Sequence, residues 1–121
     1  RLREQLIRKM SVFKKLPSLN DELKENDKAI AISEREWMEI RMLMDTEYDQ
    51  FTERLQRVVP ELNVSELNFC CLLKINVSMH DLANIYCINK ASVSRRKQRL
   101  KDKIGDDLLH GQTLDDFLQR F

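Results

Sequence analysis

The sequence is poor in the residues that interrupt helices. Glycine and proline occur only twice each in 121 residues, while 42% of the residues are hydrophobic and 34% are charged. Because glycine and proline are the strongest local signals for turns and loops, their scarcity argues against a fold of many short strands. The length is that of about one domain, with enough hydrophobic residues for one modest core. We therefore expect an all-α protein.

A long apolar run is also missing. The longest, from Phe69 to Leu73, covers five residues, whereas a helix needs about 20 to cross a bilayer. The sequence starts with Arg1, and neither an apolar signal core nor a small-residue cleavage site follows. We expect a piece of a longer protein whose N-terminal sensor domain lies outside this sequence. That protein is expected in the cytoplasm, or as the cytoplasmic tail of a larger, membrane-spanning protein.

Cysteine and histidine are too few and too scattered for a metal site. Cys70, Cys71 and Cys87 are odd in number and lack a C-x-x-C spacing, which favours a reducing compartment. His80 and His110 have no plausible carboxylate and nucleophile set, and His80 with Cys87 lacks the four-ligand spacing of zinc. We expect no enzyme, no cofactor and no bound metal.

Charge is arranged in blocks of opposite sign although the net charge is only +1. Residues 1–19 carry +5, residues 20–53 carry −7, residues 54–89 carry 0, residues 90–105 carry +6 and residues 106–121 carry −3. Blocks of opposite sign imply different partners for different surfaces. The acidic block is expected to be solvated and to repel a phosphate backbone, whereas residues 90–105 form a basic stripe.

The N-terminal half, residues 1–60, is interpreted as a helical linker or dimerisation region. Apolar residues at steps of three and four predict a first helix that ends near Lys15, before Pro17. A short helix from Asn20 or Asp21 through Ala29 is expected next. The first helix draws its apolar face from Leu2, Leu6, Met10 and Phe13.

A long amphipathic helix is predicted over residues 34–57. Ser33 with Glu36 forms a capping box, and apolar residues then recur at steps of three and four. This stripe either packs on the C-terminal helices of the same chain or continues a coiled-coil seam to a second subunit. Its members are Trp37, Ile40, Met44, Tyr48, Phe51, Leu55 and Val58.

Residues 62–105 are predicted to form three helices with very short connections. The first begins at Asn63 or Ser65 and is apolar almost all round, which predicts burial on several sides. A capping box from Ser78 to Asp81 opens the second helix, and Cys87 and Ile88 make the turn. Asn89 then caps the third helix, residues 90–103, which points Val93, Leu100 and Ile104 inward and ends at Gly105. Its outward residues are Lys90, Ser94, Arg95, Gln98, Arg99 and Asp102.

This segment resembles the LuxR/GerE-type DNA-binding domain of bacterial transcription regulators. The family's Leu-Thr-x-x-Glu corresponds to residues 62–66, its Ser-x-x-Glu-Ile-Ala to residues 78–83, its Ile-Ser-x-x-Thr-Val to residues 88–93 and its Lys-Leu-Gly to residues 103–105. The match is gapless over 44 of 121 residues. Two positions depart from the pattern: Arg96 stands where the family usually has His, and Cys87 where it often has Gly or Asn.

The resemblance implies a helix-turn-helix domain over residues 61–121 that binds double-stranded DNA as a homodimer and places the third helix in the major groove. By their positions in the family's pattern, the side chains expected to contact base edges are those of Ser94, Arg95 and Gln98. The residues expected to contact DNA phosphates are Lys90, Arg99 and Lys101, with Ser78 as a further candidate.

The C-terminal segment is predicted to form a final short helix capped by Thr113. Its apolar residues either mediate dimerisation, as the family's fourth helix commonly does, or close the core of one chain. These residues are Leu114, Phe117, Leu118 and Phe121. An alternative function is a helical protein-interaction or dimerisation module that keeps the helix-turn-helix scaffold without DNA binding.

Overall fold

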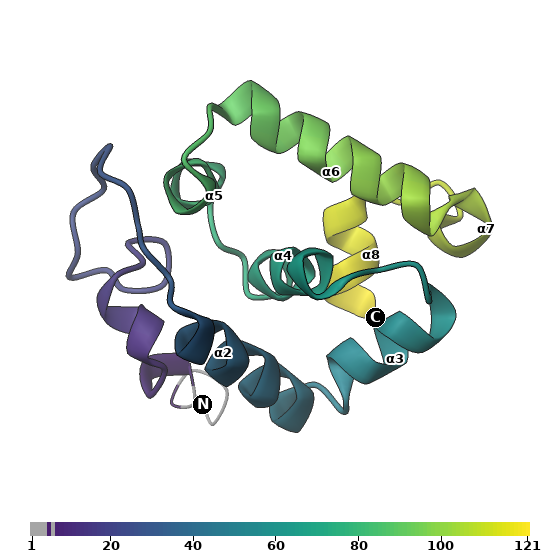
Figure 1. The fold of residues 1–121 in the computed structure, drawn as a ribbon, viewed down its shortest axis with the longest axis horizontal. Coiled ribbons are helices and arrows are strands. Elements are labelled where there is room, and N and C mark those ends of the chain that lie inside the picture. Colours follow the sequence, from purple (N-terminus) through teal and green to yellow (C-terminus); the bar gives the residue numbers. More distant parts are fainter. Residues whose placement is uncertain (1–4, 6) are drawn as a thin grey trace.

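The computed structural model describes residue 5 and residues 7–121, and this part of the chain is helical without strands (Figure 1). The predicted all-α class is therefore confirmed. None of the described helices is long and apolar enough to cross a bilayer. The elements are η1 (Ser11–Lys14), α2 (Glu34–Glu47), α3 (Phe51–Val58), α4 (Val64–Lys74), α5 (Met79–Tyr86), α6 (Lys90–Ile104), α7 (Asp106–Leu109) and α8 (Leu114–Arg120).

The first predicted helix does not continue to Lys15. Gln5, Ile7 and Arg8 are helical, but the chain then bends and η1 follows. Leu2 and Leu6, which were expected on its apolar face, lie outside the described residues. The bend lets the Ser11 N–H donate to the Glu39 carboxylate of α2 at 2.6 Å. Val12 rather than Phe13 becomes buried as a result, together with Met10 and Leu16.

The expected helix from Asn20 to Ala29 is absent, because local side-chain hydrogen bonds favour turns there. Asn20 accepts the Glu22 N–H and Asn26 accepts the Lys28 N–H, each two residues ahead. Leu23, the only strong apolar residue, is not buried. Residues 18–30 instead form an irregular strap that lies beside α5 (Figure 1).

The predicted long helix is two helices. Ser33 and Glu36 form the predicted capping box of α2, but Asp49 and Gln50 adopt left-handed conformations with φ of 50° and 57°. The break is held by the Asp45 carboxylate, which accepts both the N–H and the hydroxyl of Thr52. Arg54 adds hydrogen bonds to the backbone oxygens in the bend.

The stripe of this segment is buried within the chain, as the first of its two interpretations proposed. Ile40, Met44, Phe51 and Leu55 are almost fully inaccessible, whereas Val58 is exposed. α2, α3 and α8 all pack on α4, which lies at the centre of the molecule (Figure 1). The expectation that α4 is buried on several sides is confirmed.

The C-terminal helices complete the same core. Asn63, Asn89 and Thr113 cap α4, α6 and α8 as expected, and Gly105 ends α6 with φ of 86°. The short helix α7 was not predicted. One hydrophobic cluster runs from Met10 to Leu118, across residue 60; the division into residues 1–60 and 61–121 stays a prediction. Within it are Leu114, Phe117 and Leu118, which pack in the core of the single chain.

Candidate nucleic-acid interface

A tight turn joins α5 to α6. α5 ends at Tyr86, and Cys87 adopts a left-handed conformation with φ of 54°. The N–H groups of Cys87 and Ile88 both donate to the Ala83 carbonyl oxygen. Asn89 then accepts the Ser92 N–H at 2.7 Å and starts α6. The predicted turn at residues 87–88 is therefore confirmed, although Cys87 lacks the conformational freedom of glycine.

One face of α6 is packed and the opposite face is open. Val93, Leu100 and Ile104 are buried, as predicted. At 3.6 residues per turn, Arg95, Gln98, Arg99 and Asp102 lie on the opposite, exposed side. The structure thus brings two of the three predicted base-reading residues onto one exposed face.

The third base-reading candidate, Ser94, lies toward the flank that faces α8. With Gln98 and Lys101 it lines a shallow cavity of about 230 Å³ that α8 closes through Thr113, Leu114 and Asp115. Lys90 is exposed and lies on the same flank by helical periodicity. Two of the predicted phosphate contacts thus share one edge of the open face.

Five cations of α6 have no acidic partner among the residues that the structure describes. Two others are neutralised: Lys97 lies 3.2 Å from Asp115, and Lys103 lies 2.7 Å from Glu66. The five unpaired cations are Lys90, Arg95, Arg96, Arg99 and Lys101. All of these except Arg96 were predicted to contact bases or phosphates, so intramolecular ion pairs do not compete with such contacts.

Ser78 has a different setting. Its hydroxyl accepts the Asp81 N–H and caps α5, but the Asp81 carboxylate accepts the Ser18 N–H of the strap at 2.8 Å. The reciprocal half of the predicted capping box is therefore not formed. Two residues beyond Ser78, the His80 ring contacts the strap carboxylates of Glu25 at 3.0 Å and Asp27 at 3.3 Å. Acidic groups close to the start of α5 disfavour phosphate there.

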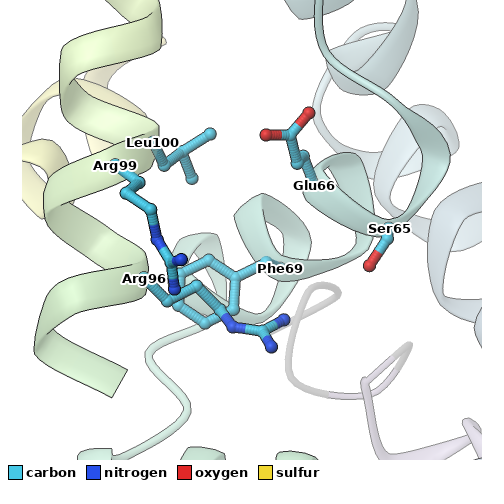
Figure 2. A pocket seen from close by; sticks show the side chains of 6 residues that line it. All are labelled: Ser65, Glu66, Phe69, Arg96, Arg99 and Leu100. Atoms are coloured by element: carbon cyan, nitrogen blue, oxygen red, sulfur yellow. The ribbon is translucent and has the colours of Figure 1, made fainter. Parts of the chain in front are cut away.

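A second cleft, which sequence reasoning missed, lies on the other flank of α6. Figure 2 shows the side chains of Arg96 and Arg99 reaching from α6 toward α4, with Ser65 and Glu66 on the opposite wall. Phe69 and Leu100 complete the lining. The three-residue spacing of Arg96 and Arg99 indicates that both lie on one side of the helix. The sequence does not indicate that α4 forms the opposite wall of the cleft.

Aromatic rings hold Arg96 in this cleft. Its guanidinium carbon lies 4.3 Å from the centroid of the Tyr86 ring and 5.9 Å from that of Phe69. Burial raises the pKa of Tyr86, and the charge of Arg96 opposes that rise only in part. The phenol therefore stays neutral, and the two rings present apolar faces to the guanidinium.

The remaining reactive groups do not assemble a chemical centre. The described residues contain no group of three or more His, Cys, Asp or Glu side chains arranged to hold a metal ion. Burial raises the pKa of the Cys70 thiol to about 12 and raises that of Cys71 further. These thiols are therefore protonated members of the core. The absence of catalysis and of a cofactor stays a prediction.

Comparison with models of known families, with curated proteins and with solved structures finds no match to this chain. The resemblance to the LuxR/GerE-type domain accordingly rests on the motifs in the sequence and is carried forward as a proposal.

Proposed function

We propose that this chain is the sequence-specific DNA-binding output domain of a bacterial transcription regulator, and that α6 enters the major groove of double-stranded DNA. The observation that carries the proposal is the face of α6: its exposed side combines Arg95, Gln98 and Arg99. An α-helix about 10–12 Å across fits a major groove about 12 Å wide.

The side chains on this face suit base edges. Arg95 reads guanine through two parallel hydrogen bonds, and Gln98 reads adenine in the same way. In the free protein Arg95 donates to the Ser92 hydroxyl at 2.7 Å, and Gln98 donates to Asp102 at 2.9 Å. These intrahelical contacts are solvent-exposed and exchange for base contacts at little cost. Ser94 is the third proposed base contact, near the N-terminal half of the helix.

Phosphate contacts flank the reading face. Lys101 lies toward α8, Lys90 lies on the same flank of α6 by helical periodicity, and Arg99 lies toward α4. In this proposal they neutralise the two sugar-phosphate strands that border the groove and set the register of the helix. Ser78 remains the weakest phosphate candidate because of the strap carboxylates beside His80.

The wider setting is proposed on the same resemblance. The domain works in the cytoplasm, or on the cytoplasmic side of a membrane-spanning protein, and receives a signal from a sensor domain outside this sequence. A homodimer would place two recognition helices on half-sites about one helical turn, 10–10.5 base pairs, apart.

Substitution of Arg95 tests the base-reading role. On an operator selected from genomic fragments, Arg95→Ala is expected to weaken binding by about 1–3 kcal/mol and to relax the sequence preference. Lys101→Ala is expected to weaken binding to the operator and to random duplexes by similar factors. Arg57→Ala, which removes an exposed cation of α3, is the matched control. Equal losses on operator and random DNA for Arg95→Ala would show that this residue does not read bases.

A protein-interaction or dimerisation module is the second candidate, and one observation favours it. On α2 the side chains of Met38 and Met42 are 54% and 64% exposed. They line a groove of about 410 Å³ with Arg35, Glu39, Leu43 and Thr46. Exposed apolar grooves of this kind are common at helix-binding surfaces. Binding of a protein there would show no steep dependence on salt, unlike binding to DNA.

A further inference from the structure

The cleft between α4 and α6 has the donors of a phosphate site, and its two guanidinium groups are not bonded to an acceptor in the described part of the chain. Its volume is about 340 Å³, and Arg96, Arg99 and Ser65 line it (Figure 2). Neither guanidinium forms a hydrogen bond or an ion pair with any residue in the described part of the chain. Each guanidinium carries five N–H donors in a planar fork. Two such forks therefore face one cleft with their N–H donors unbonded.

The charge balance of the cleft is positive. Its one carboxylate, Glu66, accepts the Lys103 ammonium at 2.7 Å and the Asn63 N–H at 2.9 Å. Burial raises the pKa of Glu66, but these two hydrogen bonds outweigh burial and hold it below the usual value. Glu66 is therefore ionised and cancels Lys103, which leaves the charges of Arg96 and Arg99 uncompensated. Like charges three residues apart on a helix repel each other, and an anion between them removes that cost.

The cleft is organised in advance for an anion. The Tyr86 ring covers one face of the Arg96 guanidinium, so the N–H edges of the group stay free. Across the cleft stands the first turn of α4, an 11-residue helix. The N–H groups of Val64 and Ser65 have no intrahelical acceptor, and the positive end of the helix dipole favours negative charge. Guanidinium forks match phosphate oxygens with two parallel hydrogen bonds.

We propose that the α4–α6 cleft binds a phosphate group, and that this group is a backbone phosphate of the DNA strand that runs along the α4 side of α6. The DNA source rests on the proposed function, whereas the phosphate chemistry does not. A helix that fills the major groove lies between two sugar-phosphate strands, so each flank meets one of them. The cleft adds Arg96 and Ser65 to the contacts that hold the recognition helix in register.

Two single substitutions in the first turn of α4 test the cleft. Ser65→Glu places a carboxylate among the donors, yet an acidic residue at this position stabilises a helix start, so the variant is expected to fold. Val64→Glu adds the same charge one residue away, on an exposed side chain that does not line the cleft. We expect Ser65→Glu to weaken duplex binding at least about tenfold, as for loss of a charged hydrogen bond. Val64→Glu should weaken it much less, and equal losses would overturn the assignment.

The salt dependence provides a second readout. Arg99→Gln should reduce the slope of log affinity against log salt by about 0.9, the value for one phosphate contact on duplex DNA. Arg57→Gln on α3 should leave the slope unchanged. If Ser65→Glu and Arg99→Gln bind DNA like the unaltered protein while Arg95→Ala loses its operator, the cleft assignment and the Arg99 phosphate contact fail, and DNA binding through the exposed face of α6 stands.

Titrations with duplex DNA and with inorganic phosphate distinguish a site for a DNA backbone phosphate from a site for free phosphate. The side-chain Nε–H resonances of Arg96 and Arg99 should shift with duplex DNA, and chloride at equal ionic strength is the control. A saturable shift with inorganic phosphate as well shows that the cleft also accepts free phosphate. Should the protein bind no DNA at all, a phosphate-specific shift would support a free-anion site alone. No shift with either probe would overturn the proposal.

Discussion

Replacing Cys87 with glycine is expected to stabilise the protein by about 0.5–1 kcal/mol. Cys87 holds φ of 54° in the turn between α5 and α6, and the left-handed conformation costs a residue with a Cβ about 1–2 kcal/mol. Glycine removes that cost but adds about 0.5–1 kcal/mol of backbone entropy to the unfolded state. Little else is lost, because the side chain is exposed and its thiol makes only a 3.8 Å contact with the Asn84 carbonyl oxygen.

Urea unfolding followed by circular dichroism measures this difference, with Cys87→Ala as the matched control. Alanine removes the thiol but keeps the Cβ, so its free energy of unfolding should stay close to that of the unaltered protein. If Cys87→Gly is no more stable than Cys87→Ala, the turn is not strained and the reasoning from its left-handed conformation is refuted.

Three further predictions concern reactivity, acid stability and the core. A thiol-alkylating reagent should modify only the exposed Cys87 in the native protein, with the two buried thiols reacting after unfolding; mass spectrometry that finds all three modified at equal rates would contradict the packing of α4. A hydrogen bond from Lys15 lowers the pKa of Glu36 below 4.5. The ionised Glu36 carboxylate therefore stabilises the folded protein above that pH, and this stabilisation is lost as the pH falls through the lowered pKa. Glu36→Gln should therefore lower the free energy of unfolding by up to about 1 kcal/mol at neutral pH and by less in acid, and a pH-independent difference would count against the ion pair. Leu118→Ala should cost about 2–5 kcal/mol because the side chain is fully buried, whereas Met42→Ala on the exposed α2 groove should change stability by about 0.5 kcal/mol or less; similar costs for both would exclude the packing of α8 in the monomer core.

Helix starts were predictable because their chemistry is local. Each of Ser33, Asn63, Ser78, Asn89 and Thr113 caps a helix by accepting the N–H three residues ahead. The side chain, the N–H it binds and the apolar residues that follow all lie within a few positions of one another. The positions of the recognition helix and its buried residues followed from the same signals.

The break between α2 and α3 was not predictable from periodicity. Tyr48 and Phe51 keep the three-residue step through the bend, so the apolar pattern continues where the helix stops. The bend depends on Asp45 bonding to Thr52. It also depends on Arg54, which bonds the Tyr48 carbonyl oxygen and, 67 residues away, that of Phe121. A contact between residues so far apart in the sequence does not change the spacing of the apolar residues, so periodicity does not indicate it.

One part of the candidate site was predictable from the sequence and another part was not. The exposed face of α6 followed from helical spacing, since Arg95, Gln98 and Arg99 recur at steps of three and four opposite the buried residues. The cleft with Arg96 did not follow, because its other wall comes from α4, some 30 residues earlier in the chain. The strap also escaped prediction: asparagine side chains replaced a weak helix with turns and brought acidic groups beside His80.

The most direct test of groove binding by α6 is a fluorescence-anisotropy titration of genomic duplex fragments at two salt concentrations. The five unpaired cations of α6 predict that log affinity falls linearly with log salt, with a slope of about −0.9 for each phosphate neutralised. Charge-neutral substitution of these cations should flatten the slope. Absence of binding at low salt by a folded protein would contradict the DNA-binding account and favour the apolar groove of α2 as the functional surface.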